Sequence, residues 1–274
     1  MQTEQMIQKG VRIAPESFQH PADKAACDAI RSSDEFKKAL GLISEKSLEK
    51  YLEGIYSASL LQITPKMSPE LYKMLDNAMK LFDEERLPVI YTTRSYEAMT
   101  NIEGVKKKYV TVTTGLLSKL NEKKAQMWAA QCICAIKCGY GEIGFIDLLC
   151  QNIGGLILPD IVVNALSMLM ANWRKYSLLT LDRAALIASG DINETIRNIY
   201  IGFPEALLEG DDLASPDSML YKQAKELAKT KNAVTAAARN IYAATRKNAF
   251  RSLRYFELLD FYRTDYRDLL EELE

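Results

Sequence analysis

The sequence predicts an α+β fold that is mostly α-helical, with one small antiparallel or mixed β-sheet. Apolar residues recur at helical spacing over most of the 274 residues. Only the segments 88–93 and 108–113 are rich in the β-branched and aromatic residues that strands favour. The composition, with 48% hydrophobic and 26% charged residues, is that of a globular chain that buries a core without disulfides.

The first part of the chain, residues 1–65, is expected to be helical. Its apolar side chains recur every three to four positions between residues 24 and 61. The next helix should begin at the Ser-Pro-Glu sequence of residues 68–70, which places a capping residue before proline and an early carboxylate. This helix is expected to end near Arg86.

The two strand segments follow, and we expect a turn at Gly104 to join them. After Gly115 the pattern predicts helices again, over 116–120, 122–137, 191–201 and from 218 to the end. We expect one domain, a metallopeptidase-like unit on the resemblance described below. Its parts are an N-terminal helical segment (1–65), a core with the sheet (66–205) and C-terminal helices (206–274).

The longest apolar region, residues 143–173, predicts two buried helices broken near Pro159. Polar residues interrupt it, so no uninterrupted stretch is long enough to span a bilayer. We therefore expect no membrane contact, with a segment lying at a membrane surface as the alternative. Five cysteines, an odd number, and an N-terminus without the layout of a signal peptide favour a cytoplasmic location.

The charge balance argues against recognition of nucleic acid. Lys plus Arg (35) and Asp plus Glu (36) nearly cancel, giving a net charge of -1. Such a chain has no overall field to attract nucleic acid or an anionic membrane. We expect a peptide or protein partner recognised locally, and the sequence leaves the oligomeric state open.

A single histidine restricts the catalytic chemistry. His20 is the only imidazole in the chain, whereas a zinc peptidase of the H-E-x-x-H type needs two, one helical turn apart. A Ser-His-Asp or Cys-His pair would have to use His20, which lies in a proline-flanked stretch and is expected to be a cap or turn residue. The sequence also has no P-loop and no dinucleotide-binding glycine motif.

Five separated stretches nevertheless carry a family resemblance, chiefly through their order. They are residues 20–23 (His-Pro-Ala-Asp), 68–72, 109–117, 173–186 and 248–254. In this order they resemble the HtpX-like and CAAX-prenyl-protease-like zinc metallopeptidases, over most of the chain. The resemblance implies that the substrate-side edge strand, which would bind a peptide, consists of Tyr109, Val110, Thr111, Val112 and Thr113.

Carried over residue by residue, the family's zinc site is degenerate. Ala130 and Cys134 stand where the two zinc histidines would be, and Gln131 where the general-base glutamate would be. Leu178 replaces the ligand glutamate, and Asn248 stands where a late histidine is usual. No shift of the alignment restores a histidine. Without zinc to acidify water and a carboxylate to accept its proton, the resemblance implies an inactive homologue with no cofactor, zinc being expected only if that interpretation is wrong.

Two other groups of residues are candidates for weaker roles. Cys134 and Cys138 lie one helical turn apart and are weak metal-ligand candidates, but Cys132 projects about 200° away, so small buried hydrophobes are the preferred interpretation. Asp182 and Arg183 match framework residues of the family. With the metal site lost, we expect an ion pair or hydrogen-bond network between helices there.

Three functions follow as hypotheses. The first is a pseudopeptidase that binds an extended peptide by β-augmentation at the edge strand without cutting it. The second is a divergent enzyme, a metallopeptidase or another hydrolase with a rebuilt site. The third is a structural or oligomerising subunit whose cleft is filled by side chains such as Trp128 and Met127. An open groove would favour the first over the third.

Overall fold

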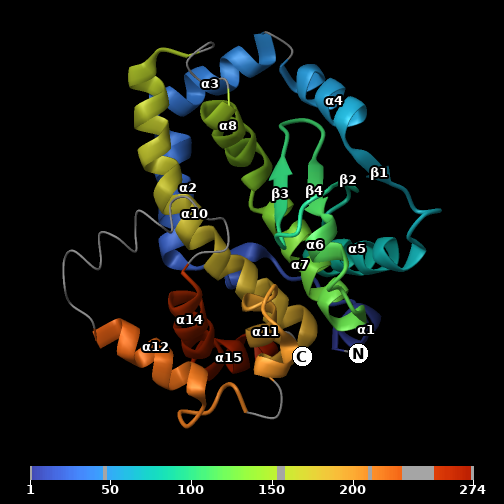
Figure 1. Cartoon of the computed structure of the whole chain (residues 1–274), viewed down its shortest axis with the longest axis vertical. Helices are drawn as coiled ribbons and strands as arrows, with labels where there is room; N and C mark the ends of the chain where they lie inside the picture. The colour runs from blue at the N-terminus through green and yellow to red at the C-terminus, as the bar shows by residue number, and fades with distance from the viewer. Residues whose placement is uncertain (1, 46–47, 153–157, 209–211, 230–249, 273–274) are drawn as a thin grey trace.

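The computed structural model describes residues 2–45, 48–152, 158–208, 212–229 and 250–272. It is mostly helical with one small mixed sheet, which confirms the predicted fold class (Figure 1). The elements before the sheet's central part are α1 (Gln2–Gln8), α2 (Pro21–Ser32), α3 (Asp34–Glu45), α4 (Leu48–Ser59), β1 (Leu61–Ile63) and α5 (Pro69–Phe82). The later helices are α6 (Thr114–Leu117), α7 (Glu122–Lys137), α8 (Tyr140–Asn152), α10 (Asp160–Ser189), α11 (Ile192–Ile199), α12 (Met219–Lys229), α14 (Arg251–Arg263) and α15 (Asp265–Glu272).

The sheet differs from the predicted one in its connections. Its order is β1-β2-β4-β3, where β2 is Val89–Thr93, β3 is Thr100–Glu103 and β4 is Tyr109–Thr113. The two predicted strands, β2 and β4, are neighbours in the sheet but run parallel, so a single turn does not join them. Gly104, with a φ of +114°, instead turns the chain from β3 into β4, which pair antiparallel.

The expectation that β4 is an edge strand was wrong. The chain crosses over after β2 and returns as β3, so that β4 lies between them and both its edges are occupied by neighbouring strands. All five of its residues are buried, namely Tyr109, Val110, Thr111, Val112 and Thr113. A partner cannot add a strand at β4 without breaking the sheet.

Helix α8 packs against β3, one of the two edge strands of the sheet. A Cβ atom at Gly144 of α8 would lie only 2.3 Å from the Ile102 carbonyl oxygen, so the close approach depends on glycine at this position. A Cβ at Gly141 would lie 2.9 Å from the Gly104 carbonyl oxygen. The helix and the strand lie side by side in Figure 1, and this packing covers the end of β3 nearest Gly104.

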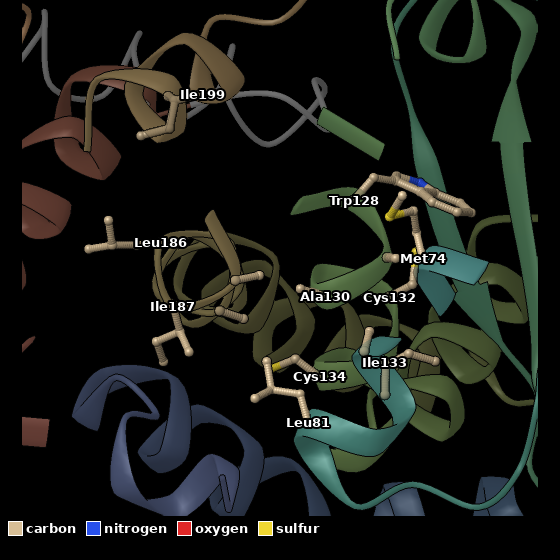
Figure 2. Packing of buried hydrophobic residues seen from close by; sticks show 14 of the residues in the cluster. Met74, Leu81, Trp128, Ala130, Cys132, Ile133, Cys134, Leu186, Ile187 and Ile199 are labelled. Atoms are coloured by element: carbon tan, nitrogen blue, oxygen red, sulfur yellow. The ribbon is translucent and has the colours of Figure 1, made fainter. Parts of the chain in front are cut away.

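Helix α7 runs through the core with the boundaries that the sequence predicted. The Asn121 side chain caps it by accepting a hydrogen bond from the Lys124 amide at 2.9 Å. Between Met127 and Ile136 every residue except Gln131 is buried. The helix packs against α5 and α10, and Figure 2 shows Met74 and Leu81 of α5 beside it. Such all-round burial is typical of a central helix.

The apolar region before and after Pro159 forms two helices, as predicted, but the second is not buried as expected: Ile161 and Met168 of α10 are 79% and 76% exposed. Helix α8 ends at Asn152, and α10 begins at Asp160 with Pro159 in the preceding capping position. Among the described residues, no helix is both long enough and apolar enough to cross a membrane.

Candidate functional site

A pocket of about 120 Å³ lies where the start of β3 meets α7, α10, α11 and α14. Two of the five positions predicted for the lost zinc site, Gln131 and Leu178, line this pocket. Trp128 and Cys132 join Gln131 on the same face of α7, because positions three and four apart on a helix are neighbours. Asn248 lies outside the described residues. We call this cavity the Gln131 pocket.

The other two predicted positions are not brought to this pocket. Ala130 and Cys134 are 1% and 0% exposed and belong to the apolar core. In Figure 2, Cys134 points toward Leu81 of α5, whereas Trp128 and Cys132 lie on the other side of α7. Of the three positions on α7, only Gln131 therefore lines the pocket, whereas Ala130 and Cys134 turn toward the packed core.

The polar groups around the Gln131 pocket are two amides, a hydroxyl, an indole, a thiol and a paired guanidinium. The Gln131 Oε1 accepts a hydrogen bond from the Asn198 Nδ2 at 3.5 Å, and the Trp128 Nε1 donates to the Thr100 Oγ1 at 2.9 Å. The described residues that line the pocket include no carboxylate and no imidazole. The amides can hydrogen-bond a peptide group, but none of these polar groups is a carboxylate or imidazole that could act as a general base.

The neighbouring residues Asp182 and Arg183 of α10 make contacts with other parts of the fold, including the ion pair between helices that the sequence predicted. Arg254 of α14 donates from Nε and a terminal nitrogen to the Asp182 carboxylate at 2.7 and 2.6 Å, and both residues are buried. Burial raises the pKa of Asp182, and the adjacent guanidinium opposes that rise. Arg183 donates to the Phe18 carbonyl at 3.0 Å and lies over the Phe261 ring, 4.4 Å from its centre.

The cysteines of α7 are arranged as packing residues. The Cys134 and Cys138 sulfurs are 4.0 Å apart, and Cys134 is fully buried. No group of three or more His, Cys, Asp or Glu side chains within the described ranges could hold a metal ion. Burial raises the pKa of both Cys132 and Cys134, which disfavours the thiolate that a metal requires.

Thiol reactivity provides a test of this assignment. Cys27, Cys132 and Cys134 are buried, whereas Cys138 and Cys150 are partly exposed. Burial raises the pKa of Cys150 to about 11, so Ellman's reagent at pH 8 should label Cys138 first, Cys150 slowly and the other three only in urea. Rapid native labelling of Cys134 would contradict the buried-thiol assignment.

Three of these thiols, those of Cys27, Cys132 and Cys150, give stability a pH dependence. Each folded-state pKa is raised, so the neutral thiol is favoured by folding, and its contribution is fully present below the unfolded pKa of about 8.5. It declines as the pH rises toward the folded values. The urea concentration at the unfolding midpoint should therefore decrease as the pH is raised from 7.5 to 9.5. A Cys27→Ala/Cys132→Ala variant should show a smaller decrease.

Sequence reasoning missed a buried network around Asp23. His20 caps α2 as expected, its Nδ1 accepting from the Ala22 amide at 3.1 Å. Asp23, 0% exposed, accepts from the Thr180 hydroxyl at 2.7 Å, from the Gln19 amide at 2.9 Å and from the Tyr140 hydroxyl. An acidic residue in the first turn of a helix looks like a surface charge in the sequence. No sequence signal distinguishes it from one.

Comparisons with protein-family models, with curated proteins and with solved structures found no match to this chain.

Proposed function

We propose that this chain is a non-hydrolytic peptide- or protein-binding protein, a degenerate relative of the zinc metallopeptidases that it resembles. The Gln131 pocket would receive an apolar side chain of the partner. The observation that carries the proposal is the position of the pocket beside Gln131 and Leu178. These are the two positions where the resemblance places a base and a metal ligand, and neither side chain can perform those roles.

The size of the Gln131 pocket suits a single side chain. Its volume is about 120 Å³, and a dry apolar cavity of roughly 150 Å³ accepts a benzene molecule. Apolar walls are supplied by Leu116, Leu178, Leu181 and Ile199. An aliphatic side chain or a small ring is therefore the expected occupant.

The amides beside the Gln131 pocket suit a peptide backbone. The hydrogen bond between Gln131 and Asn198 is 3.5 Å long, at the outer limit for such bonds, so little is lost when either amide turns to a partner. Gln131 is also the one residue between Met127 and Ile136 that is not buried. Side-chain insertion replaces strand addition in this proposal, because β4 is internal and α8 covers part of β3.

A pocket-filling variant tests the proposal. Random 12-residue peptides would be selected for binding to the wild-type protein, and their affinities measured by fluorescence anisotropy. Leu178→Trp fills the pocket and should weaken the selected peptides at least about tenfold, a loss of about 1.4 kcal/mol. Met168→Trp is the matched control, because Met168 lies on the same helix but is 76% exposed and does not line the pocket.

The bound peptides should also stay intact. We expect mass spectrometry to find no cleavage of the selected peptides or of casein, with or without added zinc, and purified tag-free protein to contain no stoichiometric metal. Equal binding by both tryptophan variants, or a selection that enriches no peptide, would contradict peptide binding at this pocket. Chelator-sensitive cleavage would instead favour the divergent metallopeptidase.

A further inference from the structure

A second and larger pocket lies beside the first and has a different chemical character. Its volume is about 430 Å³, and it shares Ile201 with the Gln131 pocket. It is formed by the connection between α6 and α7, the first turn of α7, α11 and the short turn Glu205–Leu207. Pockets of roughly 300–1,000 Å³ are typical of small-molecule sites. We call it the Lys124 pocket.

Basic side chains predominate among the charged residues that line the Lys124 pocket. Lys119, Lys124 and Arg197 contribute three cations, and Glu205 contributes the only carboxylate among the described lining residues. The proximity of the Lys124 ammonium, and then of Lys119 and Arg197, lowers the pKa of Glu205. Lys124 and Lys119 therefore act most strongly on the place that the carboxylate occupies, because Arg197 is also paired with Glu194 of its own helix at 2.9 Å.

The ion pair at the centre of this pocket is asymmetric. The Lys124 side chain is 6% exposed and its Nζ contacts the Glu205 carboxylate, whose side chain is 64% exposed. Lys124 also lies in the first turn of α7, the end of a helix where the dipole disfavours a cation. A buried lysine held there needs an anion, and the anion present comes from an exposed turn.

The segment that carries Glu205 is held by little packing. Gly202, Phe203, Pro204, Glu205, Ala206 and Leu207 are all exposed. Gly202 has a φ of +108°, and the turn Glu205–Leu207 has no buried residue. Moving the carboxylate away from Lys124 would therefore cost few apolar contacts.

Apolar surface lies next to the cations. Tyr200 and Phe203 place their ring centres 6.3 Å apart, and Leu120 and Leu208 also line the pocket. Aromatic and aliphatic walls beside a cation cluster match a ligand with a charged end and an apolar body.

We infer that the Lys124 pocket binds an organic anion, in which a carboxylate or phosphate group is attached to an apolar body, and that Glu205 competes with this group for Lys124. The two halves of one ion pair then have opposite roles. Lys124 binds the ligand, whereas Glu205 weakens binding by occupying the ligand's place. A purely structural ion pair would give no such opposition.

Calorimetric titration with benzoate and with phenyl phosphate tests the inference, and benzyl alcohol is the neutral control ligand. Glu205→Gln should tighten the binding of at least one anion about fivefold or more, whereas Lys124→Met should abolish it. Asp28→Asn is the matched control, because it removes an exposed carboxylate from a lysine pair elsewhere and changes the net charge equally. The ratio of the two affinities identifies which anionic group the site prefers.

Three results would overturn the inference. The first is that neither the wild type nor Glu205→Gln binds either anion. The others are an equal gain in anion affinity in Glu205→Gln and Asp28→Asn, or undiminished anion binding by Lys124→Met. Should Lys124→Met fail to fold, Lys119→Met serves in its place, because Lys119 is only partly buried and must also weaken binding. Leu178→Trp should leave the anion affinity unchanged, so that this site and the proposed peptide pocket can fail separately.

Discussion

Replacing Arg254 with methionine should destabilise the protein by about 3–5 kcal/mol, as expected when one partner of a buried ion pair is removed. The guanidinium makes two short hydrogen bonds to Asp182, whose side chain is 2% exposed. Methionine fills a similar volume but leaves the carboxylate buried without a counter-charge. Urea denaturation at pH 7, followed by circular dichroism, measures the loss.

Two controls separate this effect from a general loss of charge. Arg12→Met removes an arginine from an exposed pair with Asp83, whose side chains are 59% and 68% exposed, and should cost less than about 1 kcal/mol. The double variant Asp182→Leu/Arg254→Met removes both buried charges and should recover most of the loss. A loss in Arg254→Met no larger than in Arg12→Met would contradict the buried-pair assignment.

The pH response of Arg254→Met gives an independent check. Burial raises the pKa of Asp182, and the variant lacks the guanidinium that opposes this rise. When the pKa of an acid is higher in the folded state than in the unfolded state, protonation of that acid stabilises the folded protein. The variant should therefore regain stability relative to wild type as the pH falls from 7 toward 5. A deficit that stays constant over this range would indicate lost packing rather than an unpaired carboxylate.

Local signals in the sequence determined the helices well. Helix α7 begins where it was predicted because Asn121 caps its first turn, and α10 begins after Pro159. The strands β1 and β3 were missed because Leu61–Ile63 and Thr100–Glu103 are only three and four residues long. Their pairing, and the internal position of β4, depend on contacts between segments that local patterns do not specify.

The candidate site was predicted only in part, for a related reason. Nine of the ten residues from Met127 to Ile136 are buried, so no amphipathic face shows which side of α7 meets a pocket. Gln131, the one residue that is not buried, does line the pocket, whereas Ala130 and Cys134 face the core. The contact of Lys124 with Glu205 joins segments far apart in the sequence and follows only from the fold.

Replacing Asp23 with alanine should destabilise the protein by about 3–5 kcal/mol, because each stranded buried donor costs about 1–3 kcal/mol. The carboxylate is 0% exposed and accepts hydrogen bonds from Thr180 of α10, Tyr140 of α8 and Gln19. It thus connects three helices through buried hydroxyls. Denaturation in urea at pH 7 gives the size of the effect.

Asp28→Ala is the control, because Asp28 lies on the same helix in an exposed pair with Lys24 and should cost less than about 1 kcal/mol. Adding Tyr140→Phe and Thr180→Val to Asp23→Ala removes the stranded hydroxyls. The triple variant should therefore lose less stability than the sum of the three single-variant losses. A cost for Asp23→Ala equal to that of Asp28→Ala would mean that water replaces the carboxylate. A large cost would assign Asp23, in the His-Pro-Ala-Asp stretch that supports the family resemblance, to helix packing, a role that does not require peptidase chemistry.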